Sequence, residues 1–91
     1  MSTVWVAIPE EEWNALTAFV ASQGTLPFGI DVSVRTAKAT EGWRIVAFTS
    51  AAAVTALIRR INDYAQTWDV PWAVPLNRIL PRLYAAVGPV T

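Results

Sequence analysis

The chain of 91 residues contains no cysteine and no histidine. Histidine is the commonest general base and metal ligand in proteins, and cysteine is the best side-chain nucleophile. Their absence argues against ordinary catalysis and against zinc binding, and the lack of cysteine also excludes a disulfide framework. Lysine occurs once, as Lys38, in a polar turn where a lowered pKa is not expected. We therefore expect a protein without cofactor or metal that is not an enzyme.

Charged residues are also scarce, at 15% of the chain against about 25% in ordinary domains, whereas apolar residues reach 54%. This excess argues against disorder and suggests that a partner or a second copy covers some apolar surface. The longest nearly uncharged stretch, Ile45 to Ile58, is shorter than the roughly 20 residues that span a bilayer. With no basic N-terminal stretch to indicate a secretion signal, we expect one cytoplasmic domain over residues 1–91, without membrane contact.

Apolar periodicity predicts the elements of the first two thirds of the chain. Residues 3–8 and 43–48 alternate as half-buried strands do, and residues 30–35 show the same pattern in Ile30, Val32 and Val34. Residues 37–42 would turn the chain between the last two strands, which should form an antiparallel hairpin. Helical spacing predicts one helix over residues 10–23. A second helix should begin after a cap at Thr49 or Ser50.

The last third of the chain is rich in proline. Residues 70–74 could form only an edge strand, because proline cannot donate to a sheet ladder. Residues 76–88 show helical spacing interrupted by Pro81, so we expect a kinked helix or two short turns. The predicted order is strand, helix, strand, strand, helix and possible edge strand. This order indicates an α+β fold of the ferredoxin-like, split βαβ kind, with a C-terminal helical tail that packs on the sheet or on a partner.

Five tryptophans are the most informative residues of the chain. Trp13 and Trp68 fall on apolar helix faces, where core packing is the expected role, and Trp72 falls in the uncertain edge segment. Trp5 differs, because the alternation that buries its neighbours on the strand sends Trp5 to the other sheet face.

The strand over residues 43–48 has the same two faces. If Val46 and Phe48 point to the core, Trp43 and Ile45 point outward with Trp5, and Arg44 points inward. We therefore expect Trp5, Trp43 and Ile45 to form an aromatic platform on the helix-free face of the sheet.

Two short segments carry a family resemblance. Val4-Trp5-Val6-Ala7 resembles the start of the first-strand motif of RNA-recognition motif domains, and residues 41–48 (EGWRIVAF) resemble their third-strand octamer. The likeness covers residues 3–76 and implies a ferredoxin-like fold with bases stacked on Trp5 and Trp43. The octamer departs from the family pattern where Glu41 replaces a basic residue, Arg44 a small residue and Ile45 the third stacking aromatic.

Three classes of function remain open. We favour a non-enzymatic protein-interaction module, self-associating or docking on a larger protein, such as a small accessory or inhibitor protein of the kind encoded by bacteriophages and mobile elements. The alternative is single-stranded nucleic-acid binding, especially of RNA, by the platform. The third is a cofactor-independent dimeric enzyme. A basic periphery would meet phosphates in the alternative, and its members are Arg35, Lys38, Arg44, Arg78 and Arg82.

Overall fold

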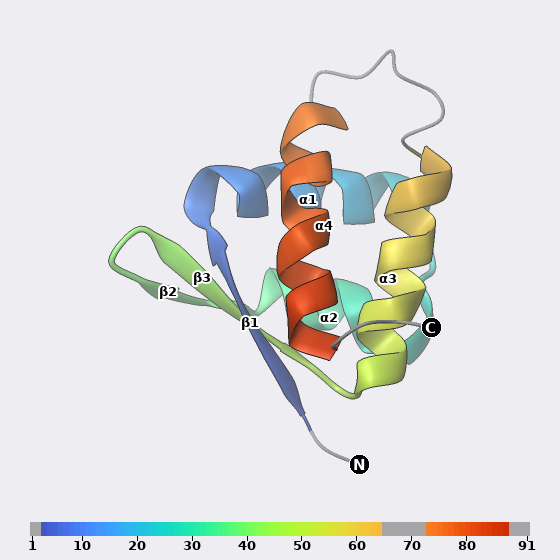
Figure 1. Cartoon of the computed structure of the whole chain (residues 1–91), viewed down its shortest axis with the longest axis horizontal. Helices are drawn as coiled ribbons and strands as arrows, with labels where there is room; N and C mark the ends of the chain where they lie inside the picture. The colour runs from blue at the N-terminus through green and yellow to red at the C-terminus, as the bar shows by residue number, and fades with distance from the viewer. Residues whose placement is uncertain (1–2, 65–72, 88–91) are drawn as a thin grey trace.

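The computed structural model describes residues 3–64 and 73–87 (Figure 1). Its elements follow the order strand, helix, short 3-10 turn, short helix, two strands and two helices. They are β1 (Val4–Pro9), α1 (Glu10–Gln23), η1 (Pro27–Gly29), α2 (Ile30–Arg35), β2 (Lys38–Thr40), β3 (Trp43–Phe48), α3 (Ala51–Tyr64) and α4 (Ala73–Val87). The fold is mixed α+β, as the sequence predicts.

The sheet has the strand order β1-β3-β2, and both pairings are antiparallel. β2 and β3 form a hairpin around Glu41 and Gly42, whose φ angles of 48° and 87° are both positive. Two positive φ angles are what a tight type I′ turn requires, and its twist matches that of the flanking strands. The expected hairpin is therefore present, but its first strand is the three residues 38–40, inside the segment predicted as a turn.

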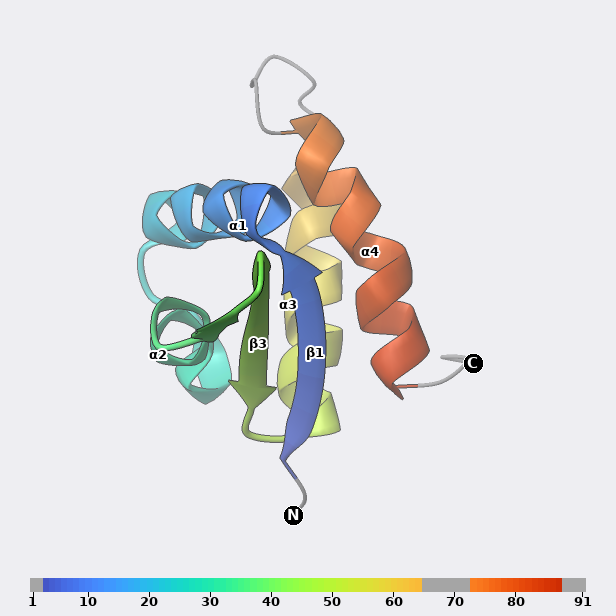
Figure 2. The same ribbon diagram turned by 90° about the vertical axis from the view of Figure 1, so that its left-hand side faces the viewer.

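The core lies between one face of the sheet and the helices. In Figure 2, α3 lies behind the sheet and α4 runs beside β1, while none of the helices formed by the described residues stands in front of β1. α4 contacts α3, α1 and β1. The largest fully buried side chains come from both strands and helices, and they include Ile8, Leu16, Phe19, Phe48, Leu57, Ile61, Ile79 and Leu83.

The strand predicted over residues 30–35 is wrong, because this segment is the helix α2. Ile30 and Val34 are buried, which fits a strand period of two and a helix period near four equally well. Val32 separates the two patterns, since it is 52% exposed although a strand would have buried it with its neighbours. Arg35 and Asp31, four residues apart, form an ion pair of 3.2 Å. This spacing is typical of a helix, and the strand prediction did not take it into account.

The C-terminal segment is helical, as predicted, although α4 begins earlier than residue 76 and includes Val74, which was assigned to an edge strand. Residues 70–72 of that predicted strand, together with Trp68 and Trp72, lie outside the described residues. α4 continues through Pro81 as one helix, so of the two predicted alternatives, a kinked helix or two short turns, the second is wrong. Leu76, Ile79 and Leu83 bury its inner face.

Candidate functional site

The helix-free side of the sheet presents an apolar surface, which we call the outer face. Strand register places Trp5 opposite Ala47 and Ala7 opposite Ile45 on this side. Trp5 is 65% exposed and Trp43 is 41% exposed, whereas the alternate residues Val6, Ile8, Val46 and Phe48 are buried in the core. The predicted phase of both strands is therefore the observed one. The outer face consists of Trp5, Ala7, Trp43, Ile45 and Ala47, with Lys38 and Thr40 at the β2 edge.

The two tryptophans differ in their surroundings. The guanidinium of Arg82 lies over the Trp43 ring, with its Cζ 5.3 Å from the ring centroid. Arg82 belongs to α4, so this contact links the C-terminal helix to the start of β3. Within the described residues, no ring–ring or cation–π contact involves Trp5, and its exposure of 65% against 41% makes it the more accessible of the two.

Arg82 also forms an ion pair with the buried carboxylate of Glu12. Its Nε donates to Glu12 Oε1 at 3.1 Å, and Glu12 is only 7% exposed. A carboxylate at that depth needs a cation, because removing its hydration is costly. Arg82 thus joins α4 to α1 and to the outer face at the same time. Its charge is compensated, so it is a poor candidate for binding a phosphate.

A groove beside Trp5 separates β1 from α4. Its volume is about 340 Å³, and it is lined by Trp5, Val6, Ala7, Arg82, Ala85 and Ala86. Three of these residues are alanines, and the groove is shallow and open to solvent. The outer face therefore combines a projecting ring with an adjacent depression. Sequence analysis missed Ala85 and Ala86, because alanines in a helix give no signal of which element they face.

Arg44 points inward, as the strand phase requires, and the structure shows what it contacts there. Its Nη2 and Nε lie 2.9 and 3.0 Å from Glu10 Oε1. Its Cζ lies 4.0 Å from the centroid of the Trp13 ring, a cation–π arrangement. Trp13 is itself fixed by its Nε1, which donates to the Val34 carbonyl at 2.8 Å. Arg44 is therefore a packed, paired side chain at the sheet's end rather than part of a basic periphery on the outer face.

The five predicted basic residues are consequently not brought together as one patch. Arg44 and Arg82 are paired with glutamates of α1, and Arg35 is paired with Asp31. Lys38 and Arg78 are exposed and form no ion pair within the described residues, but only Lys38 lies on the outer face.

The described residues, 3–64 and 73–87, contain no group of three or more acidic side chains placed to hold a metal ion. Over the same ranges, no helix has both the length and the apolar character needed to cross a bilayer. Comparisons with models of protein families, with curated proteins and with solved structures found no match to this chain.

Proposed function

We propose that this chain is a non-enzymatic protein-interaction module that acts through its outer face, and that the occupant of this face is a second copy of the chain. The observation that carries the proposal is the 65% exposure of Trp5 on an otherwise apolar, helix-free sheet surface. Tryptophan is among the residues most enriched at binding hot spots, and apolar patches of this kind mark interaction sites.

The shape of the surface favours a second copy. In a two-fold symmetric dimer, the same patch faces itself, so each projection must meet a depression of the partner. The ring of Trp5 is such a projection, and the groove of about 340 Å³ between β1 and α4 is such a depression. Because both belong to one surface, two copies can exchange their Trp5 rings across a two-fold axis.

The contact should be weak. A tryptophan buries about 150–250 Å² when it is fully covered. Because Trp5 and Trp43 are 65% and 41% exposed, the tryptophans of two copies have only about 300–500 Å² of their own surface left to bury, to which the groove walls add a similar amount. Stable specific interfaces begin near 1,200 Å² of total buried surface. We therefore expect a dimer in rapid exchange, with a dissociation constant in roughly the micromolar range.

Sedimentation velocity over a range of concentrations tests this proposal. The wild type should shift from monomer to dimer, and Trp5→Glu should remain monomeric, because it places two carboxylates in the apolar contact. Val32→Ser is the matched control, since it removes an apolar side chain of similar exposure from α2, away from the outer face. A wild type that stays monomeric near 1 mM, a concentration well above the expected dissociation constant, would refute the second copy as occupant.

Single-stranded RNA is the alternative ligand of the same face. Trp5 has an open ring on which a base could stack, and this observation keeps the alternative in consideration. The paired state of Arg44 and Arg82 weighs against it, because phosphate contacts supply much of such affinity. Titration with labelled single-stranded RNA and DNA at about 50 mM salt tests this alternative. If the wild type binds RNA and Trp5→Ala binds it more weakly, RNA is favoured over a second copy as the ligand of the outer face.

The finer fold assignment belongs to this proposal as well. The strand order β1-β3-β2 with antiparallel pairings supports a ferredoxin-like arrangement, in which a third strand separates the two strands of a βαβ unit. The short helix α2 ahead of a three-residue β2 is its main departure from that pattern. Backbone NMR shifts of residues 70–72 would test the fourth strand, which was predicted over residues 70–74 and whose last two residues belong to α4. A role as an accessory or inhibitor protein rests on analogy with other small interaction modules.

A further inference from the structure

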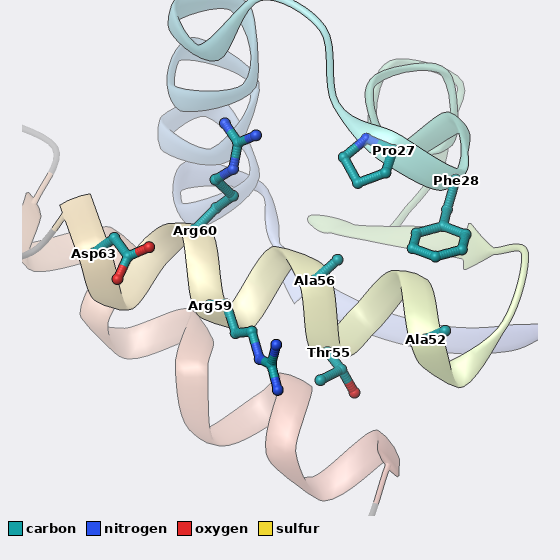
Figure 3. Close-up of a pocket in the computed structure, with 8 residues that line it drawn as sticks. All are labelled: Pro27, Phe28, Ala52, Thr55, Ala56, Arg59, Arg60 and Asp63. Carbon is teal, nitrogen blue, oxygen red and sulfur yellow. The ribbon is translucent and has the colours of Figure 1, made fainter.

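Two hollows on the surface differ in what their walls offer a ligand. The hollow between η1 and α3 has a volume of about 460 Å³. Figure 3 shows that a turn and a helix form its walls, and that Arg59 and Arg60 point to opposite sides of α3. The groove beside Trp5 has a strand, β1, as one of its walls. A helix pairs its backbone groups internally, whereas a strand at the edge of a sheet leaves half of them unpaired and able to bind another backbone.

The hydrogen-bond phase of β1 shows which backbone groups are unpaired. The Glu10 amide donates to the Gly42 carbonyl at 2.9 Å, and these two residues continue the β1–β3 register by one pair. Bonded and non-bonded pairs alternate in an antiparallel ladder, so the even-numbered residues of β1 bond to β3. The N–H and C=O groups of Trp5 and Ala7 therefore point away from β3. Pro9 agrees with this phase, because its missing N–H falls on the unpaired side.

The unpaired side of β1 faces the groove beside Trp5. Trp5 and Ala7 line this groove and are both exposed, so α4, which runs alongside in Figure 2, does not cover them. At this level α4 contributes the small side chains of Ala85 and Ala86. Among the described residues, no group on this side forms a hydrogen bond with the backbone of Trp5 or Ala7. Donors and acceptors at every second residue are what an extended polypeptide requires of its partner.

The two edges of the sheet differ in how they are protected against pairing. The β2 edge is three residues long and begins with Lys38. Short strands and lysines are two of the features by which proteins prevent edge pairing. β1 has six residues, VWVAIP, and none of them is charged. The contrast indicates that the β1 edge is the one used for binding, and that an assembly formed through it ends at two copies.

We propose that the second copy enters this groove with its own β1, so that the two β1 strands pair antiparallel and join the two sheets. This inference rests on the proposed function, because it specifies how the second copy meets the outer face. The two-fold axis passes Val6, and Trp5 of each copy lies opposite Ala7 of the other. Each of these two pairs exchanges both of its N–H···O bonds.

Backbone chemistry and side-chain size select this register. An axis at Ala7 would place Trp5 opposite Pro9, which has no N–H to donate. An axis at Trp5 would place the two rings directly opposite each other. With the axis at Val6, the largest side chain of the strand lies beside the smallest, and each ring enters the groove of the other copy. Because β1 is uncharged, it also meets no like charge when it pairs with itself.

Hydrogen exchange of the Trp5 and Ala7 amides tests the pairing directly. In wild type at about 1 mM, where the dimer should predominate, both amides should exchange at least about fivefold more slowly than in a dilute, monomeric sample. The amides of Val6 and Ile8, which bond to β3, should be protected equally in both samples and serve as the internal control. A contact between outer faces without strand pairing would leave the Trp5 and Ala7 amides open to solvent.

Ala7→Pro separates backbone pairing from side-chain contact. It removes an N–H that points away from β3, so the monomer should fold, while the dimer should dissociate about tenfold more readily because its strand pairs lose hydrogen bonds. Ala7→Ser is the matched control, since it keeps the N–H and the small side chain, and it should dimerise like the wild type. Sedimentation velocity measures association, and circular dichroism checks the fold. If Ala7→Pro does not fold, the exchange rates decide.

The outcomes separate this inference from the proposed function. A wild type that dimerises while its Trp5 and Ala7 amides exchange as in the monomer would overturn the strand pairing and leave the outer-face contact standing. Full dimerisation of a folded Ala7→Pro would do the same. A wild type that stays monomeric near 1 mM would overturn both proposals, and would leave the β1 edge to a strand of another protein.

Discussion

The guanidinium carbon of Arg44 lies 4.0 Å from the centroid of the Trp13 ring. Arg44 is on β3 and Trp13 is on α1, so this contact joins the sheet to the first helix. Glu10, one turn before Trp13, accepts hydrogen bonds from the same guanidinium. Although Arg44 is charged and lies on the core side of the strand, Trp13 provides it with an aromatic surface and Glu10 with an opposite charge.

Arg44→Ala should lower the free energy of unfolding by about 1–3 kcal/mol, because it removes the cation–π contact, the ion pair and the packing of the side-chain stem. Arg44→Lys should lose an intermediate amount, since an ammonium cannot reproduce the planar contacts. Urea denaturation followed by circular dichroism measures both changes. Arg35→Ala is the control, because its pair with Asp31 is exposed, and it should change stability by less than about 0.5 kcal/mol. A similarly small effect of Arg44→Ala would show that the contact is incidental.

The ion pair between Glu12 and Arg82 predicts a non-additive double mutant. Arg82→Met should destabilise the fold by about 2 kcal/mol, because it leaves the Glu12 carboxylate buried without a cation. Adding Glu12→Leu should recover most of this loss, since two apolar side chains then replace the pair. Denaturation of the two single variants and the double variant completes the cycle. Additive losses would mean that the two residues act separately.

Several elements could be predicted from sequence because two independent signals agree on them. β1 and β3 show clear alternation, and α1 has both an apolar stripe and acidic residues in its first turn. The outward direction of Trp5 and Trp43 followed from the same alternation, without any contact being known. α3 begins after Ser50, whose hydroxyl accepts from the Ala53 amide at 3.4 Å, at one of the two predicted caps.

The remaining features depend on contacts between segments that are distant in sequence. Residues 30–35 were assigned to the wrong class because six residues do not distinguish the two periods. Arg82 looked like a free cation because its partner, Glu12, is 70 residues away. The positive φ of Phe28 could not be predicted either, because that conformation depends on the packing of both neighbours and on Thr49.

Truncating side chains on the two faces of β1 should lower the stability by very different amounts. Ile8→Ala should cost about 2–5 kcal/mol, because Ile8 is fully buried and its loss leaves a cavity. Trp5→Ala should change the stability of the monomer by less than about 0.5 kcal/mol, since its ring is largely in solvent. Both variants can be measured at low protein concentration, where self-association does not contribute. A large loss in Trp5→Ala would mean that part of the chain covers the outer face.

Pro81 predicts a stabilising substitution. It lies inside α4 with an exposed ring, and it cannot donate the amide hydrogen bond that the carbonyl of Asn77 would accept. Pro81→Ala should restore that bond and relieve the ring's clash, partly offset by the greater freedom of the unfolded chain. We expect a net gain of about 1–2 kcal/mol, seen as a higher thermal midpoint.

Pro75→Ala is the matched control for Pro81→Ala. Pro75 lies in the first turn of α4, where backbone amides have no acceptor within the helix, so removing its ring restores no hydrogen bond. This variant should gain less than about 0.5 kcal/mol. Equal gains at both positions would attribute the effect to general helix propensity. A loss in Pro81→Ala would indicate that the proline sets a bend in α4 that Leu83 needs to reach the core.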